Sequence, residues 1–222
     1  MNRFNLKRSL HAAAFSAALL SLGASLTACV PLVLGGAAGG AALIASDRRS
    51  SGMQLEDESI ELRIVTRVRN DFGTRVRVNP VSFNRQVLLT GDVASEQDRQ
   101  AVEQLVRRVD NVASVVNELV VMNTPSLMDR SADLLITGRL KASILDDPEL
   151  QSNAFKVVTE RGTIYLMGRV TRREVERVTT LARGTSGARR VVRVFEEISD
   201  DQLRRLQPEA NPPAAAPAKP RP

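Results

Sequence analysis

The sequence contains one histidine, one cysteine and no tryptophan among its 222 residues. His11 lies in an N-terminal segment that we expect to be removed, which would leave the mature chain without histidine. Because Cys29 is the sole thiol, no disulfide can form within one chain. These shortages exclude a Ser-His-Asp triad, a Cys-His pair and a histidine-based metal site. No pair of carboxylates has a spacing typical of acid-base catalysis, so we predict a non-enzymatic protein with no metal and no cofactor.

Aromatic residues make up only 3% of the chain, although its net charge is +6 and its pI is about 10.3. Loss of the N-terminal segment removes three basic residues and no acidic one, so the net charge falls to +3. Few side chains are therefore available to stack on nucleic-acid bases. The basic balance does not indicate nucleic-acid binding, and we predict no nucleic-acid partner.

The N-terminal segment has the three parts of a secretory signal. Arg3, Lys7 and Arg8 form its positive end, and an apolar run over residues 12–22 follows. The segment ends in Leu26-Thr27-Ala28-Cys29, in which small residues precede the cysteine. This tetrapeptide is the acceptor pattern of bacterial lipoproteins.

The pattern predicts a signal peptide over residues 1–28 and lipidation of Cys29. A short transmembrane helix with a buried cysteine is the alternative, but the apolar run is shorter than the roughly 18–20 residues that a span needs. Val30 follows the cysteine where retention in the inner membrane usually needs aspartate. We therefore expect a lipid-anchored protein on the periplasmic face of the outer membrane, and an orientation towards the cell surface stays open.

Two flanking segments have compositions that do not predict a packed core. Residues 29–54 include an uncharged Gly/Ala-rich stretch over residues 30–46. We interpret this stretch as a flexible tether because glycine is costly in a helix, and a glycine-packed helix against a membrane is the alternative. We predict that residues 200–222 form a Pro/Ala-rich disordered tail, on the composition of residues 208–222.

An internal repeat occupies the chain between these segments. Residues 86–95 (QVLLTGDVAS) match residues 163–172 (TIYLMGRVTR) at an offset of about 77. A helical stripe with a spacing of four precedes each copy, at Ile64, Val68 and Phe72 and at Ile136, Leu140 and Ile144. A second helical pattern follows each copy, and both patterns open with a capping signature, Ser95-x-x-Asp98 and Thr171-x-x-Glu174.

Each copy closes on a β-branched run, over residues 115–121 and 190–195, so the unit is helix, strand, strand, helix, strand. We predict an α+β fold of two tandem domains, each with two helices packed on a three-stranded sheet. Their predicted bounds are 55–123 and 130–199, with a linker over 124–129. A linker this short indicates that the two copies touch.

The repeat unit, with its Leu-x-Gly-x-Val core and later Val-x-x-Val run, resembles the BON domain family. The resemblance is most specific at residues 156–162 and 165–174 and covers most of the mature chain except the tail. Two such domains behind a lipoprotein signal are similar to the dual-BON outer-membrane lipoproteins. The resemblance implies that the three-stranded sheet of each domain is mixed. It also implies binding of anionic phospholipid by the second domain and a role in envelope integrity near division sites.

The two copies differ in charge, which bears on where a lipid site lies. The first has nine basic and 11 acidic residues over 55–123, and the second has 13 and nine over 130–199. Anionic headgroups attract basic surfaces by roughly 1 kcal/mol per Lys or Arg. By the alignment of the helical stripes, Arg63 matches Leu135. In the strand repeat, Asp92 matches Arg169 directly after the shared glycine. This comparison favours the second copy, unless its basic face is only solvated.

The family resemblance places the lipid-contacting surface on the first helix of the second domain and on the loop after its Leu-Met-Gly strand. This assignment covers Leu135, Arg139 and Leu140, with Gly168 and Arg169 in the loop. The four-residue spacing of Leu140 is equally typical of a core residue, and Gly168 is open to an interpretation as a turn glycine with positive φ. We add Arg172 and Arg173, which oppose the dipole at the start of the following helix.

We therefore expect anionic phospholipid as the partner of the second domain. The main rival is an adaptor for outer-membrane assembly or for regulation of cell-wall hydrolases, with envelope or division proteins as partners. Lipid binding led by charge would weaken with salt, whereas an apolar protein contact would not. A cell-wall anchor formed by the tail is a third interpretation.

Overall fold

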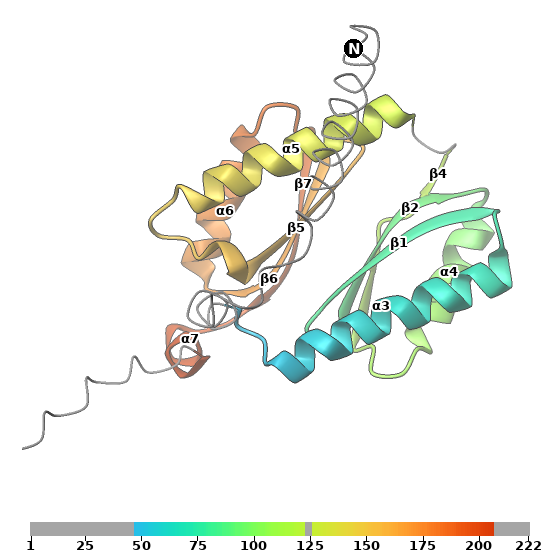
Figure 1. The fold of residues 1–222 in the computed structure, drawn as a ribbon, viewed down its shortest axis with the longest axis horizontal. Coiled ribbons are helices and arrows are strands. Elements are labelled where there is room, and N and C mark those ends of the chain that lie inside the picture. Colours follow the sequence, from blue (N-terminus) through green and yellow to red (C-terminus); the bar gives the residue numbers. More distant parts are fainter. Residues whose placement is uncertain (1–46, 123–125, 207–222) are drawn as a thin grey trace, which may run out of the picture. The chain divides into compact units, whose positions relative to one another are not determined.

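The structure, a computed structural model, describes residues 47–122 and 126–206. The predicted signal peptide, Cys29, the Gly/Ala-rich stretch and the tail from residue 207 lie outside the described residues, so the predictions made for them stay predictions. The described elements belong to two domains with the same element order (Figure 1).

The first domain consists of α3 (Ser51–Phe72), β1 (Val76–Phe83), β2 (Gln86–Val93), α4 (Glu96–Arg107), β3 (Ser114–Asn117) and β4 (Val120–Val121). Strand β2 pairs antiparallel with β1 and parallel with β3 and β4. The predicted final strand is thus split in two, because the side-chain oxygen of Asn117 accepts a hydrogen bond of 3.1 Å from the backbone N–H of Leu119 and interrupts the ladder.

The second domain consists of α5 (Leu127–Leu145), the short helix η2 (Ser152–Ala154), β5 (Phe155–Glu160), β6 (Thr163–Val170), α6 (Arg172–Gly184) and β7 (Arg190–Glu197). Strand β6 pairs antiparallel with β5 and parallel with β7. The predicted α+β fold with mixed sheets is therefore confirmed. Helix α7 (Asp200–Leu206) lies within the predicted tail, whose first residues are thus helical.

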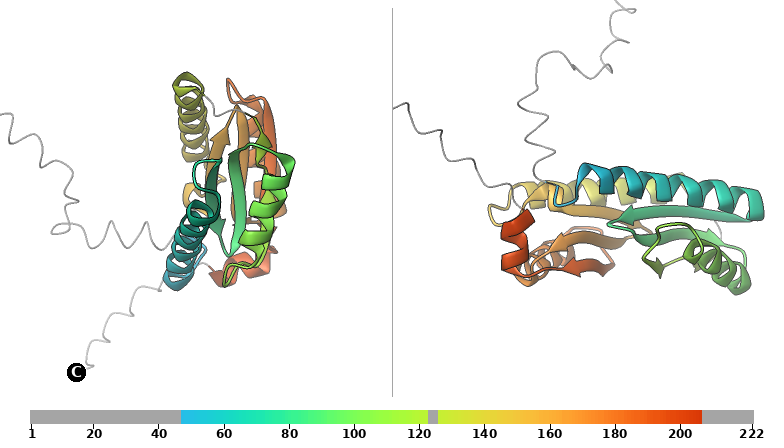
Figure 2. Two further views of the ribbon diagram at one scale, coloured as in Figure 1. Left: turned by 90° about the vertical axis from the view of Figure 1, so that its right-hand side faces the viewer. Right: turned by 90° about the horizontal axis from the view of Figure 1, so that it is seen from below.

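In each domain the two helices cover the same face of the sheet, as Figures 1 and 2 show. Alternate residues of β2, beginning with Val87 and Leu89, pack against Val102 and Val106 of α4 and the stripe of α3. The same alternation in β6 turns its residues towards α5 and α6, and these are Ile164, Leu166 and Val170. Because strand side chains alternate between faces, the intervening residues point away from the helices.

A buried aspartate near the start of each first helix sets the true alignment of the two domains. Asp57 in α3 accepts hydrogen bonds of 2.8 Å from the backbone N–H groups of Asn84 and Arg85 in the β1–β2 turn. Asp133 in α5 accepts equivalent bonds of 2.8 Å from Arg161 and Gly162 in the β5–β6 turn.

The alignment of Arg63 with Leu135 is therefore wrong by one helical turn. The buried positions 57, 60, 64 and 68 of α3 correspond to 133, 136, 140 and 144 of α5, so Leu135 is equivalent to Ser59. A stripe that repeats every four residues looks the same after a shift of one turn, and the aspartate is what distinguishes the two alignments.

In each sheet, one face is covered by the helices. The opposite faces of the two sheets pack on each other, and we call this contact the seam. Its apolar centre consists of Val81, Phe83, Leu88, Tyr165, Met167 and Val194. Buried Asp92 lies at its edge and accepts hydrogen bonds from Arg77 of its own domain (2.7 Å) and Arg161 of the other (3.2 Å). Burial raises the pKa of Tyr165 to about 12, and the nearby Glu118 carboxylate adds to the shift.

We predict that Met167→Asp weakens the seam, because it places a charge at a fully buried position between the sheets. The expected loss is about 3 kcal/mol or more, and urea unfolding should separate into two transitions as the domains uncouple. Leu62→Asp, at a position on α3 that is 68% exposed, is the matched control. Equal unfolding midpoints for the two variants would contradict this account of the seam.

Candidate functional site

The residues predicted to bind lipid lie at two ends of the second domain and do not form one patch. Leu135 and Arg139 border a groove beside Gly162 and Gly187, next to the first residue of β6. Arg169 lies near the other end of β6, six residues along the strand from Thr163. At about 3.3 Å per strand residue, the two ends are roughly 20 Å apart.

Leu140 is a core residue and does not contribute to a lipid-binding surface. Its exposed fraction is 0%, and it packs with Ile136 and Ile144 in the core of the second domain. The sequence left the role of Leu140 open between core and lipid contact. Its four-residue spacing from Ile136 and Ile144 is the spacing of the buried face of α5.

Gly168 lies inside strand β6, paired with Phe155, and not in a loop with positive φ. A Cβ atom built on this residue would lie 2.3 Å from the carbonyl oxygen of Ala154. Glycine is therefore needed so that the backbone of η2 can approach the strand. The residue has a structural explanation that requires no ligand.

Arg169 also lies in β6, and its side chain makes contacts within the protein. Its Nε donates to Glu196 at 3.0 Å, and its Nη1 donates to the carbonyl oxygen of Arg48 at 3.4 Å. The difference between Asp92 and Arg169 suggested a gain of lipid binding, but it reflects two different sets of contacts near the ends of the central strands β2 and β6.

Arg172 and Arg173 are exposed in the first turn of α6. Arg172 pairs with Glu176 at 3.3 Å, and Arg173 pairs with Glu149 at 3.0 Å. Exposed pairs of this kind contribute little to stability, so both guanidinium groups stay accessible. Neither residue adjoins Leu135, and their assignment to the lipid site stays a prediction.

Helix α5 has an apolar outer face in addition to its buried one. Leu134, Gly138, Ala142 and Leu145 are all exposed and follow one another at spacings of four, four and three residues, which places them on one stripe. Leu135, 60% exposed, and Met128 lie beside it. We call these six residues the outer face of α5. Exposed apolar side chains that gather on one face of a helix are typical of an interaction surface.

Sequence reasoning found Leu135 but missed Leu134, Leu145 and Met128 on the same face. The composition of the helix indicates a second apolar face, because α5 carries only five charged residues among 19, and one of them, Asp133, is buried. The four-residue stripe of Ile136, Leu140 and Ile144 marks only the buried side of α5 and carries no information about its opposite side.

Positive side chains border the outer face. Arg139 and Lys141 are exposed on α5 itself, and Arg139 donates a 3.2 Å hydrogen bond to the carbonyl oxygen of Ser186. Arg139, Arg161 and Arg189 line a groove of about 490 Å³ next to Leu135, together with Asp129 and Asp133. Arg189, which sequence reasoning did not single out, thus lies beside Leu135.

The equivalent helix of the first domain is different. Leu55 and Leu62 are exposed on α3, but this helix carries five acidic and three basic residues, against two and three on α5. An anionic surface would therefore repel α3 and attract α5. Of the two first helices, α5 therefore has the charge that is better suited to an anionic surface.

The part of the chain that the structure describes contains neither a candidate metal site nor a candidate membrane-spanning helix. No described cluster of three or more His, Cys, Asp or Glu side chains is arranged to hold a metal ion. Over the same residues, no helix has the length and apolar character needed to cross a membrane.

The BON domain model matches residues 56–123 and 132–197, which together make up more than half of the chain. The chain belongs to the BON domain family. We refer to its two domains as BON1 and BON2. The matched ranges begin within α3 and α5 and end at or near the last strand of each sheet.

Two named relatives each match more than two thirds of the chain. The chain is 34% identical over 182 residues to the outer membrane lipoprotein DolP of Haemophilus influenzae, covering 81% of this chain and 94% of the relative. It is 27% identical over 154 residues to a 21 kDa hemolysin of Actinobacillus pleuropneumoniae, covering 68% and 79%. These matches show a protein that is similar to DolP and built from two BON domains.

We predict that Gly168→Ala destabilises BON2 by about 1–3 kcal/mol, because the new methyl group would overlap a backbone oxygen. Gly138→Ala, on the outer face of α5 with no atom within 4 Å of the new Cβ, is the matched control and should stabilise by about 0.5–1 kcal/mol. Urea unfolding measures both. Equal effects of the two substitutions would show that Gly168 is not constrained by η2.

Proposed function

We propose that this chain is a non-enzymatic outer-membrane lipoprotein, anchored through Cys29 on the periplasmic face, whose BON2 domain binds anionic phospholipid. The observation that carries the proposal is the outer face of α5, where an exposed apolar stripe is bordered by Arg139 and Lys141. Such a helix is suited to lie in the membrane interface, with its leucines among the acyl chains and its cations at the phosphates.

The free energies expected for these contacts are consistent with reversible binding of BON2 to a membrane. Burial of one exposed leucine side chain is worth about 1.5–3 kcal/mol, and each cation near an anionic surface adds roughly 1 kcal/mol. A lipid anchor on the same chain would hold BON2 near the membrane at high effective concentration, so weak intrinsic affinity would be enough. The likeness to an outer membrane lipoprotein and the predicted acceptor at Cys29 support this anchor.

The same surface could serve envelope integrity in two ways. In the account we favour, BON2 contacts the lipid directly and acts near division sites. In the alternative, the outer face of α5 covers a protein of the outer-membrane assembly or cell-wall hydrolase machinery. The basic border favours the lipid, because an anionic bilayer presents a continuous negative surface, and the two accounts differ in their dependence on salt.

The fragment from residue 43 to residue 222 is suited to the test, because every described element lies within this unit. We predict that it co-floats with vesicles of anionic phospholipid but not with neutral ones. Leu135→Glu should weaken binding about tenfold or more, since it removes an inserting side chain and adds a repelled charge. Leu62→Glu, an exposed leucine of α3, is the matched control and should bind as the unmodified fragment does.

Salt and charge provide a second arm of this experiment. Raising the ionic strength from about 0.05 to 0.5 M should weaken binding several-fold, and so should Arg139→Gln. Failure of the unmodified fragment to bind either vesicle type would contradict the lipid account. Equal losses for Leu135→Glu and Leu62→Glu would place the contact elsewhere on the protein.

A further inference from the structure

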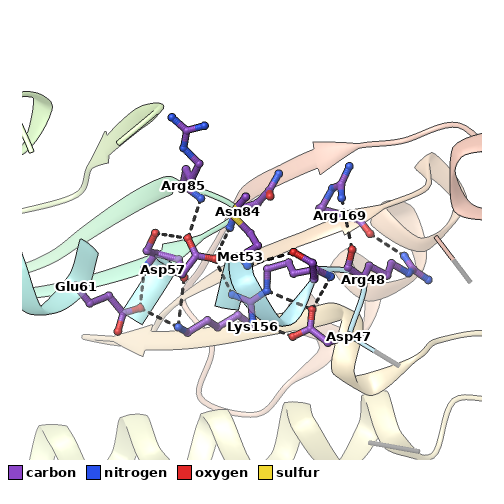
Figure 3. A network of polar contacts seen from close by, with 12 residues as sticks. Asp47, Arg48, Met53, Asp57, Glu61, Asn84, Arg85, Lys156 and Arg169 are labelled. Atoms are coloured by element: carbon purple, nitrogen blue, oxygen red, sulfur yellow. Dashed lines mark hydrogen bonds and ion pairs between the residues drawn. The ribbon is translucent and has the colours of Figure 1, made fainter. Parts of the chain in front are cut away.

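The described chain begins with a segment, Asp47–Arg49, that contacts both BON domains (Figure 3). Arg48 reaches BON2, where its guanidinium forms two hydrogen bonds with the carboxylate of Glu174, at 2.9 and 2.6 Å. The same guanidinium donates to the carbonyl oxygen of Arg169 at 2.8 Å. Only 3% of the Arg48 side chain is exposed, so this is a buried ion pair.

Arg49 reaches BON1 in the opposite direction. Its guanidinium donates to Asp57 at 2.8 Å and to Asp47 at 2.8 Å, and it lies 4.1 Å from the centre of the Phe83 ring. Phe83 belongs to the seam. Two adjacent arginines thus bind carboxylates of two different domains.

Each of these carboxylates also organises its own domain. Glu174 caps helix α6 by accepting a 2.8 Å hydrogen bond from the backbone N–H of Thr171. Burial opposes its ionisation, but the hydrogen bonds from Arg48 and Thr171 outweigh burial and lower its pKa. Asp57 holds the β1–β2 turn through the N–H groups of Asn84 and Arg85.

Two consecutive arginines close to a lipid anchor would ordinarily suggest contact with phospholipid headgroups. The structure favours a different role, because each guanidinium is held by carboxylates and little exposed. Removing one partner from such a buried pair leaves an uncompensated charge, which is why the arrangement fixes the chain firmly.

The segment also lies beside the outer face of α5. Asp47 and Arg49 line a groove of about 590 Å³ that is lined on its BON2 side by Lys141 and Leu145 of α5. The point at which the N-terminal part of the chain joins the two domains is therefore next to the C-terminal end of the proposed membrane-binding face.

We propose that Asp47–Arg49 is a latch, which fixes the point where the predicted tether joins the two BON domains and holds it beside the outer face of α5. The latch thereby keeps this face close to the anchor, which favours its contact with the membrane that holds the anchor. Arg48 and Arg49 are positioning residues in this account, since they act through Glu174 and Asp57 and not on the lipid. The orienting role rests on the proposed function. The attachment of Asp47–Arg49 to both domains does not depend on it.

Hydrogen exchange on the fragment 43–222 tests the latch. Arg48→Ala should speed exchange of the Thr171 amide about tenfold or more. It should also speed exchange at Asn84 in BON1, because release of Arg48 frees the neighbouring Arg49. Arg107→Ala, which removes an exposed arginine paired with Glu103 on α4, is the control and should change neither amide.

An effect of Arg48→Ala at Thr171 alone would overturn the latch, since it would show two independent ion pairs. If Arg48→Ala does not fold, Arg48→Lys keeps the charge without the two parallel bonds. It should then speed exchange at both amides to a smaller extent, and a change at one amide only would again overturn the proposal.

The orienting role is tested on the full-length lipidated chain in vesicles of anionic phospholipid. A polarity-sensitive fluorophore attached through Ala142→Cys reports whether the outer face of α5 enters the bilayer. The fraction of probe in an apolar environment should fall several-fold when Arg48→Ala and Arg49→Ala are combined, and should not change with Arg107→Ala. An unchanged signal in the combined variant would overturn the orienting role. Absence of the apolar signal without any latch substitution would instead contradict the proposed function.

Discussion

The arrangement of the two domains depends on the burial of the sheet face that the helices leave uncovered in each domain. A three- or four-stranded sheet with helices on one side leaves its other side to be covered, and here each sheet covers the other through Leu88, Tyr165 and Met167. The charged side chains around this contact, such as Asp92 between Arg77 and Arg161, are consequently used within the protein. What the protein presents to a partner is therefore mainly the outer sides of its helices.

The two first helices then differ in the property that matters for a membrane. Both have a buried stripe and an aspartate that holds a hairpin turn, so their inner sides follow one plan. Their outer sides diverge, because α3 is rich in acidic residues while α5 is apolar and bordered by cations. A repeat whose copies share a core but differ outside is consistent with one copy that binds a surface and another that supports it.

The mixed sheets were implied by the family resemblance. Sequence patterns by themselves were sufficient for the element order and the capping box at Thr171, because each depends on residues that are close together in the chain. They failed where a contact links distant parts of the chain. The roles of Gly168 and Arg169 are set by Ala154, Glu196 and Arg48, and no local spacing indicates these partners. The alignment of the first helices failed for a different reason, since a four-residue repeat has several equivalent registers. Leu135 was found because the family resemblance pointed to its helix, although the alignment that also supported it was wrong.

The most direct measurement of the central claim is a nuclear magnetic resonance titration of the fragment 43–222 with bicelles containing anionic phospholipid. The account predicts that perturbed backbone amides cluster along α5, from Met128 to Leu145, and in the neighbouring loop around Gly187. Perturbations centred on α3, or on the start of α6 at Arg172 and Arg173, would contradict the claim that the outer face of α5 binds the membrane.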